Sequence, residues 1–322
     1  MYLIKEITKE ESLAMIQKYH YSNTLPKINK HFIGFYLNNE LVGVVTLGWG
    51  TRPKHTIQKI FPSLDTKDYF EIGRMCMTEE MPRNSESQML SQLVKYIKLN
   101  YKEIKILFTW ADGMLGKAGY VYQASNFLYA GYSETDIYLK DGVKIHPRQT
   151  RTIFGSLNDK RKTIRPTLEQ MNICGIEHYR GRQFKYLLFL CNKKEKKKLL
   201  KESLIELTIN YPKEKDLVWR KKDNATGKWV KSGIPPYSTD MKINDNNKVI
   251  EDIRNNMLRI REVTDDLIKI VKEQSPYEKQ YIIDYKTDNT YIKKSILNEL
   301  EHRDCVADVS IVGDGYDIQL YQ

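Results

Sequence analysis

The chain has 322 residues, a hydrophobic content of 41% and a formal net charge of +11. At about 100 to 200 residues per domain, this length leaves room for two domains, or three if one is small. The apolar content suffices for a sizeable core, and no apolar run approaches the roughly 18 residues of a membrane span, which excludes a disordered chain and an integral membrane protein. The charged start MYLIKEITKEES does not read as a signal peptide. We therefore expect a protein of the cytoplasm.

The cysteines and histidines argue against a metal knuckle or a disulfide scaffold. Four cysteines in a chain of this length lie far apart, at Cys76, Cys174, Cys191 and Cys305. The six histidines show no pair at the spacing of a helical zinc site. A reducing compartment and no structural zinc site are the expectation.

The positive charge is concentrated in the middle of the chain. Residues 151–231 carry 21 Lys and Arg against 9 Asp and Glu, a net charge of +12, whereas residues 232–322 carry 12 against 17, a net charge of −5. A local excess of this kind suits a phosphate backbone. Its alternative is the solvated surface of a lysine-rich protein.

Strand and helix patterns alternate along the first 150 residues. Two apolar runs around Asn38-Asn39 predict a hairpin, and the apolar spacing after Ser85 predicts a helix with an S-x-x-Q capping box. IKILFTW predicts a buried strand, and the following YVYQASNFLYA predicts a short helix that Gly131 would close. The expected fold class is α/β with a mixed sheet.

The second half predicts a basic extension and a separate tail. We expect a strand at FKYLLFLC, then a helix over 195–207, then a linker at 232–247 that contains Pro235-Pro236. A heptad seam from Ile250 to Val271 predicts a long helix, followed by a small α+β arrangement with a final hairpin. The expected division is a domain over 1–231 with its basic segment at 151–231, the linker, and an accessory domain over 248–322. The seam could form a homodimer through residues 248–274, or it could pack on its own domain.

The order of elements in residues 1–150 is that of the acyl-CoA-binding half of acetyltransferase folds of the GNAT type. The wording of four segments is more specific, namely YHYSNTLPK at 19–27, EIGRMCMT with Arg74, PRNSES at 82–87 and FTWADGMLGKAGYVYQASNFLYAG at 108–131. Together they resemble the Mom-type DNA-modification proteins of bacteriophages, over about residues 15–155. Packing alone would not demand residues such as Asp112, Gln123 and Asn126.

The resemblance implies an acetyltransferase-like core that adds a small carbamoylmethyl-type or acyl group to the exocyclic amine of adenine in double-stranded phage DNA. Such a protein would work in the bacterial host cytoplasm and protect the DNA from restriction. The family is associated with an acetyl-CoA-like donor, and a bound iron has also been proposed for it. The family's functional positions correspond here to His20, Tyr21, Arg74, Asp112 and Tyr122.

Adenine's amino group is a poor nucleophile because its lone pair is delocalised, so the transfer needs a base and an orienting group. Asp112 ends a predicted strand, where α/β sheets present catalytic side chains. Its alternative is an aspartate that caps the following turn. Tyr122 could hydrogen-bond the donor or the target base, or it could be a core tyrosine. His20 and Tyr21 follow the first helix, where the acceptor would lie.

The expected donor site lies at the start of the helix after the PRNSES segment. A helix N-terminus binds anions with its free amides, so Arg83, Ser85 and Ser87 would hold the pyrophosphate of the donor. Arg74, on a mostly buried strand, would meet a phosphate or, alternatively, a core carboxylate.

A base in a duplex must be flipped out before it can react, which requires a grip on the backbone and an aromatic surface. Trp49 could supply the surface, although core packing is its alternative. The expected DNA contacts come from the basic segment and the residues just before it, at His146, Arg148, Lys160, Arg161, Lys162, Arg180 and Arg182. Two other functions stay open, namely an N-acetyltransferase for a protein or small-molecule amine, and a non-catalytic DNA-binding or anti-defence module.

Overall fold

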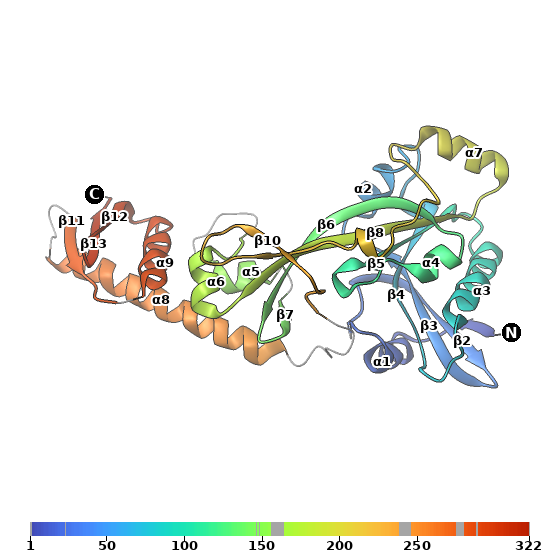
Figure 1. Ribbon diagram of the computed structural model, residues 1–322, viewed down its shortest axis with the longest axis horizontal. Helices are drawn as coiled ribbons and strands as arrows, with labels where there is room; N and C mark the ends of the chain where they lie inside the picture. Colours follow the sequence, from blue (N-terminus) through green and yellow to red (C-terminus); the bar gives the residue numbers. More distant parts are fainter. Residues whose placement is uncertain are drawn as a thin grey trace. The chain divides into compact units, whose positions relative to one another are not determined.

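The computed structural model describes residues 2–22, 24–145, 147, 149–155, 164–237, 246–274, 280–287 and 289–321. The chain forms two compact units (Figure 1). Unit 1 comprises residues 1–135, 180–219 and 232–243, and unit 2 comprises residues 136–179, 220–231 and 244–322. Both units are therefore assembled from segments that are far apart in the sequence.

Unit 1 is built on a mixed sheet in which β1 to β5 lie in sequence order, followed by β8 and β6. All neighbouring pairs from β1 to β4 are antiparallel, β4 and β5 are parallel, and β5 and β8 are antiparallel. The strands are β1 (Leu3–Glu6), β2 (Ile28–Leu37), β3 (Glu40–Trp49), β4 (Tyr69–Met77), β5 (Ile106–Asp112), β6 (Leu128–Lys140) and β8 (Glu177–Phe189). The expected mixed α/β fold is thereby confirmed.

Local sequence signals account for several of these elements. Asn38 (φ 50°) and Asn39 (φ 67°) take the left-handed turn conformation that joins β2 to β3, which confirms the predicted hairpin. The helices and short 3-10 turns of unit 1 are α1 (Lys9–Tyr19), α2 (Pro53–Gln58), η1 (Thr66–Asp68), α3 (Ser85–Asn100), η2 (Gly113–Leu115), α4 (Tyr120–Ala124), α7 (Lys193–Glu202) and η3 (Glu214–Asp216).

Helices α1 and α3 cover opposite faces of the sheet. Successive side chains of a strand point to opposite faces, so Val44 and Val45 of β3 separate the two cores. Val44 packs with Met15 and Ile16 of α1. Val45 belongs to the larger cluster that contains Leu93 of α3. We call the two sides of the sheet the α1 face and the α3 face.

Two predicted helix ends were wrong. Helix α3 begins at Ser85 with Asn84 (φ 70°) as its N-cap, and the Ser85 hydroxyl donates to the Pro82 carbonyl 2.6 Å away, so the expected capping box does not form. Helix α4 ends at Ala124, because Asn126 (φ 60°) takes the left-handed conformation before Gly131 is reached. Gly131 lies within β6.

Unit 2 contains the last residues of β6, the first residues of β8 and the C-terminal part of the chain. Its remaining elements are β7 (Val143–Ile145), α5 (Thr150–Phe154), α6 (Leu168–Cys174), β9 (Trp219–Lys222, which begins in unit 1), β10 (Trp229–Ser232, which ends there), α8 (Asn246–Gln274), β11 (Gln280–Asp284), α9 (Thr290–Glu301), β12 (Val306–Val312) and β13 (Gly315–Leu320). Strands β11, β13 and β12 form a separate antiparallel sheet, which confirms the expected small α+β tail with its final hairpin.

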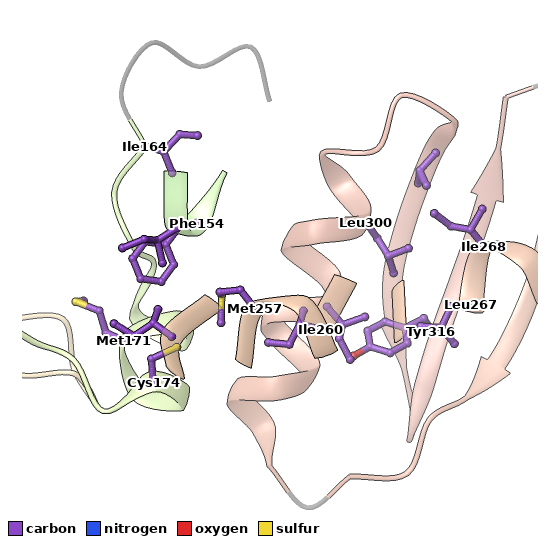
Figure 2. Packing of buried hydrophobic residues seen from close by; sticks show 14 of the residues in the cluster. Phe154, Ile164, Met171, Cys174, Met257, Ile260, Leu267, Ile268, Leu300 and Tyr316 are labelled. Carbon is purple, nitrogen blue, oxygen red and sulfur yellow. The ribbon is translucent and has the colours of Figure 1, made fainter. Parts of the chain in front are cut away.

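The predicted heptad seam lies on α8 and is buried within the chain. One part of α8 packs Met257 near Met171 and Cys174 of α6, and a later part packs Leu267 and Ile268 near the α9 and β13 side chains (Figure 2). The seam residues are buried, at Ile250, Ile253, Met257, Ile260, Thr264, Leu267 and Val271. This is the second alternative, a helix packed on its own domain. A homodimer through residues 248–274 stays a prediction.

The compact units do not follow the expected boundaries at residues 231 and 248. Part of the basic segment shares a hydrophobic core with α8 and the tail sheet, and residues 232–237 of the expected linker belong to unit 1. In the described part of the chain, no helix has both the length and the apolar character needed to cross a membrane.

Candidate active site

The site forms where β4 and β5 stop pairing. Their parallel register joins Tyr69–Ile72 to Ile106–Thr109. On the other side of β4, Ile72 pairs with Leu47 and Arg74 pairs with Thr46, so Gly73 forms a bulge. A side chain at Gly73 would stand 2.8 Å from the Pro26 ring, which is too close for a methyl group. The bulge turns Arg74 toward the α1 face.

Asp112, the last residue of β5, accepts hydrogen bonds from several directions. Its Oδ1 accepts from the Met114 amide at 3.1 Å, and its Oδ2 accepts from the Tyr237 hydroxyl at 2.6 Å. The Tyr21 hydroxyl lies close enough for the Asp112 charge to raise the pKa of Tyr21, together with burial. The alternative considered from the sequence, a turn-capping aspartate, is correct for Oδ1, because Asp112 caps η2. The other contacts bring together side chains from distant parts of unit 1.

His20 and Tyr21 lie immediately after α1, with their rings stacked 4.3 Å apart. His20 Nδ1 lies 2.9 Å from the Ser22 amide and 3.1 Å from the Ser22 carbonyl, so the ring tautomer decides whether it accepts from or donates to the Ser22 backbone. Burial, with the nearby Arg74 charge, lowers the pKa of His20 to about 4. Burial and the Asp112 charge raise the pKa of Tyr21 well above its ordinary value. At neutral pH both side chains are therefore uncharged donors.

Arg74 is held on the α1 face by the loop after α1. Its Nε donates to the Thr24 carbonyl at 3.0 Å, and its Nη2 donates to the Ser22 hydroxyl at 3.0 Å. Burial lowers the pKa of Arg74, and the neighbouring Tyr21 and Asp112 oppose that change. The guanidinium thus provides the positive charge in a cluster with Asp112.

Tyr122 lies beneath this cluster in the hydrophobic core. Its ring centroid is 5.6 Å from that of Tyr186 and 5.5 Å from that of Phe127. Burial raises its pKa. The structure therefore places Tyr122 among core side chains close to Tyr21, and a catalytic role for it stays a prediction.

The structure brings four of the expected site residues together and adds one that sequence reasoning missed. His20, Tyr21, Arg74 and Asp112 form the cluster; we call it the Asp112 site. Tyr237 is the missed member. It follows Pro235-Pro236 in the expected linker, where no sequence signal marks it as a site residue.

The residues expected at the donor site surround the start of α3. Asn84 makes no side-chain capping bond, which leaves the first-turn amides without a side-chain acceptor from the N-cap. Arg83 is exposed next to these amides. The Ser87 hydroxyl donates to the Asn84 carbonyl at 2.9 Å, and Ser85 is buried. Arg74 belongs to the Asp112 site.

Three of the expected DNA-binding residues lie in the described part of the chain. Trp49 is half-buried and its Nε1 donates to the carbonyls of Thr66 and Tyr69. Arg182 lies over the Tyr132 ring and donates to the Asp216 carbonyl at 3.0 Å. Arg180 starts the second segment of unit 1 and has partners of its own. The others lie outside the described residues, namely His146, Arg148, Lys160, Arg161 and Lys162.

Glu71 is a second buried carboxyl group that the sequence did not indicate. Glu71 of β4 pairs with Gly48 of β3, two residues from Thr46, which pairs with Arg74. Glu71 therefore lies on the same face of the sheet as Arg74. The Gly50 amide donates to Glu71 Oε2 at 3.1 Å. Burial raises the pKa of Glu71 to about 7, although the hydrogen bond from Gly50 lowers it.

The Asp112 site does not fit an iron ion. Among the described residues no group of three or more His, Cys, Asp and Glu side chains could hold a metal ion. His20 Nδ1 is engaged by the Ser22 backbone, and both Asp112 oxygens are already hydrogen-bonded. Iron therefore enters no step described below.

Solved acetyltransferase structures resemble the chain at low identity. An acetyltransferase from Bacillus subtilis in complex with CoA is 13% identical, with a TM-score of 0.32, and the match covers 59% of this chain and 100% of that one. An N-acetyltransferase from Staphylococcus aureus Mu50 is 14% identical, with a TM-score of 0.33 and coverage of 60% and 99%.

One relative of the chain is a phage protein whose name states an activity. The methylcarbamoylase mom of Escherichia phage Mu is 32% identical over 186 residues, which are 58% of this chain and 74% of that protein. The model of the Mom protein family matches residues 1–213. That segment contains His20, Tyr21, Arg74, Asp112 and Tyr122, the positions for which the sequence resemblance was drawn. This chain therefore belongs to the Mom protein family.

Proposed function

We propose that the chain is a phage DNA modification enzyme that transfers a small carbamoylmethyl-type or acyl group to the exocyclic amine of adenine in DNA. The observation that carries the proposal is the Asp112 site itself, of which His20, Tyr21, Arg74 and Asp112 lie inside the family-matched segment. The relative from phage Mu, named a methylcarbamoylase, supports a group transfer of this kind. Modified adenine would protect the phage DNA from restriction in the host cytoplasm.

The chemistry assigns a separate task to each side chain. Asp112 accepts the proton that the adenine amine loses as its nitrogen bonds to the transferred carbon. Its hydrogen bonds to Met114 and Tyr237 fix the direction of the carboxylate. Arg74 balances the negative charge. His20 would orient the acceptor as a neutral ring whose Nδ1 is already engaged by the Ser22 backbone.

The start of α3 is the proposed donor site. For transfer of an acyl group, an acyl-CoA-type donor would, when bound, supply the electrophilic carbonyl carbon and a thiol leaving group. The amides of the first turn and the exposed Arg83 would hold its pyrophosphate, since a helix N-terminus attracts anions. Ser87 would contribute its hydroxyl oxygen as a further polar contact.

DNA is the proposed acceptor because the basic segment 151–231 carries a net charge of +12. An adenine amine is buried within a duplex, so the base must leave the stack before it reaches Asp112. Lys193, Lys194 and Lys197 of α7 are exposed and available to phosphates.

Mass spectrometry of nucleosides tests the proposal. Plasmid DNA co-expressed with the full chain should contain an adenosine with added mass, and DNA co-expressed with Asp112→Asn should not. Incubation with labelled acetyl-CoA and either DNA or protein distinguishes the rival N-acetyltransferase. Unmodified DNA that still binds the chain would instead indicate the non-catalytic DNA-binding module.

A further inference from the structure

We propose that Tyr237 is a positioning residue for Asp112, supplied by a part of the chain that lies beyond the family-matched segment. The proposal deepens the proposed function and rests on it. The family match ends at residue 213, and Tyr237 lies 24 residues later. Completion of the site would thus depend on a segment that the family pattern does not contain.

The contact between the two side chains is short and shielded from solvent. The Tyr237 Oη lies 2.6 Å from Asp112 Oδ2, and Tyr237 is only 7% exposed. Burial and the Asp112 charge raise the pKa of Tyr237 far above its ordinary value, so the hydroxyl keeps its proton and donates. A hydrogen bond from a neutral donor to a carboxylate is stronger than one between neutral groups.

The segment that carries Tyr237 is seated on the loop that follows Asp112. Pro235 Cγ lies 3.8 Å from the position that a side-chain carbon of residue 116 would occupy, and Gly116 has the left-handed φ of 76°. Trp219, also beyond the family match, donates from Nε1 to the Gly113 carbonyl at 2.8 Å. Pro235 and Trp219, both beyond residue 213, therefore contact the Asp112–Gly116 loop.

The consequence is a carboxylate held at both oxygens. Met114 fixes Oδ1 through the adjacent backbone, and Tyr237 fixes Oδ2 through a side chain far along the sequence. A base that rotates freely reaches its proton in the right geometry less often, and a misplacement of about 1 Å can cost about 100-fold in rate. Tyr237 thus acts on the reaction through Asp112, and Trp219 supports the loop that both share.

The test compares Tyr237→Phe with Tyr211→Phe in the full chain. Tyr211 is the matched control because its hydroxyl donates at 2.8 Å to a backbone carbonyl, that of Phe127, in the same unit. We expect Tyr237→Phe to lower kcat by roughly 10- to 100-fold with the KM for DNA unchanged. Tyr211→Phe should keep the wild-type kcat and KM.

A measurement independent of activity separates this proposal from the proposed function. Asp112→Asn should lower the Tm less in the Tyr237→Phe background than in the wild-type background, and by the wild-type amount in the Tyr211→Phe background. Equal Tm changes in all three backgrounds would overturn the coupling. A wild-type kcat for Tyr237→Phe would overturn the positioning role. If the wild-type chain modified no DNA, the proposed function would fail, and the Tm comparison would still decide whether Tyr237 holds Asp112.

Discussion

Burial and the charge of Asp112, at the end of β5, together raise the pKa of Tyr21, next to the end of α1. This electrostatic contact joins the first family motif to the last one across 91 residues. Because Tyr21 stacks on His20 and the Arg74 charge acts on both, these polar side chains and Asp112 form one cluster.

Asp112→Asn should abolish most modification. The amide cannot take up a proton, and loss of a general base typically costs about 100- to 10,000-fold in rate. Counting modified adenosines by mass spectrometry gives the rate, and DNA affinity in a binding assay is the control that should stay near wild type. Wild-type amounts of modified adenine from this variant would remove Asp112 from the mechanism.

Coenzyme A should protect the protein against thermal unfolding, and the protection should grow with its concentration. Arg83→Ala should weaken that protection, because Arg83 is exposed beside the first-turn amides of α3. Thermal shift across a coenzyme A titration measures both effects. No stabilisation at millimolar concentrations would mean that this chain uses another donor.

Replacing Lys160, Arg161 and Lys162 together by alanine should weaken binding to all DNA sequences about equally. Each phosphate contact contributes a slope of about −0.9 to the dependence of log affinity on log salt, so the slope should flatten by roughly 2 to 3. The matched control is a triple alanine variant at Lys95, Lys98 and Lys102, exposed residues outside the basic segment, which removes the same charge. Equal losses from both variants would assign the effect to overall charge instead of to specific contacts.

His20→Asn should reduce the loss of unfolding free energy that the protein suffers as the pH falls. The pKa of His20 is lowered from 6.5 to about 4, so as the pH falls from 6.5 to 4 the unfolded chain takes up a proton that the folded chain refuses. This difference costs the wild type about 3 kcal/mol of unfolding free energy over that window. Asparagine does not titrate, and its carbonyl can still accept from the Ser22 amide. Denaturant unfolding at pH 7.5 and pH 4.5 compares the two; a parallel decline in both proteins would contradict the prediction.

Glu71→Gln should stabilise the fold at alkaline pH and leave it unchanged in acid. The pKa of Glu71 is raised from 4.5 to about 7, so the folded chain keeps a proton that the unfolded chain loses between these values. Stability therefore declines as the pH rises through this window, by about 3 kcal/mol in total. Glutamine stays neutral and can still accept from the Gly50 amide. Unfolding at pH 4.5 and pH 8.5 measures the difference, and an equal shift at both values would point to packing instead.

Local sequence patterns were sufficient to predict several elements that depend on neighbouring residues, although not their exact ends. Asn38-Asn39 determined a tight hairpin because asparagine tolerates the left-handed conformation that such turns require. The apolar spacing determined α3 and α8, since residues three and four apart share one face of a helix. The family wording determined the group His20, Tyr21, Arg74 and Asp112.

Only the tertiary structure decided which distant side chains meet. Tyr237 reaches Asp112 across 125 residues, and nothing near either residue encodes that contact. The heptad seam of α8 was equally compatible with a partner chain until α6, α9 and β13 were seen to cover it. The Gly73 bulge, which aims Arg74, arises from how β4 meets β3 and not from β4 alone. Periodicity and turn preferences act over a few residues, whereas these contacts form only when the packing of the whole unit brings remote segments together.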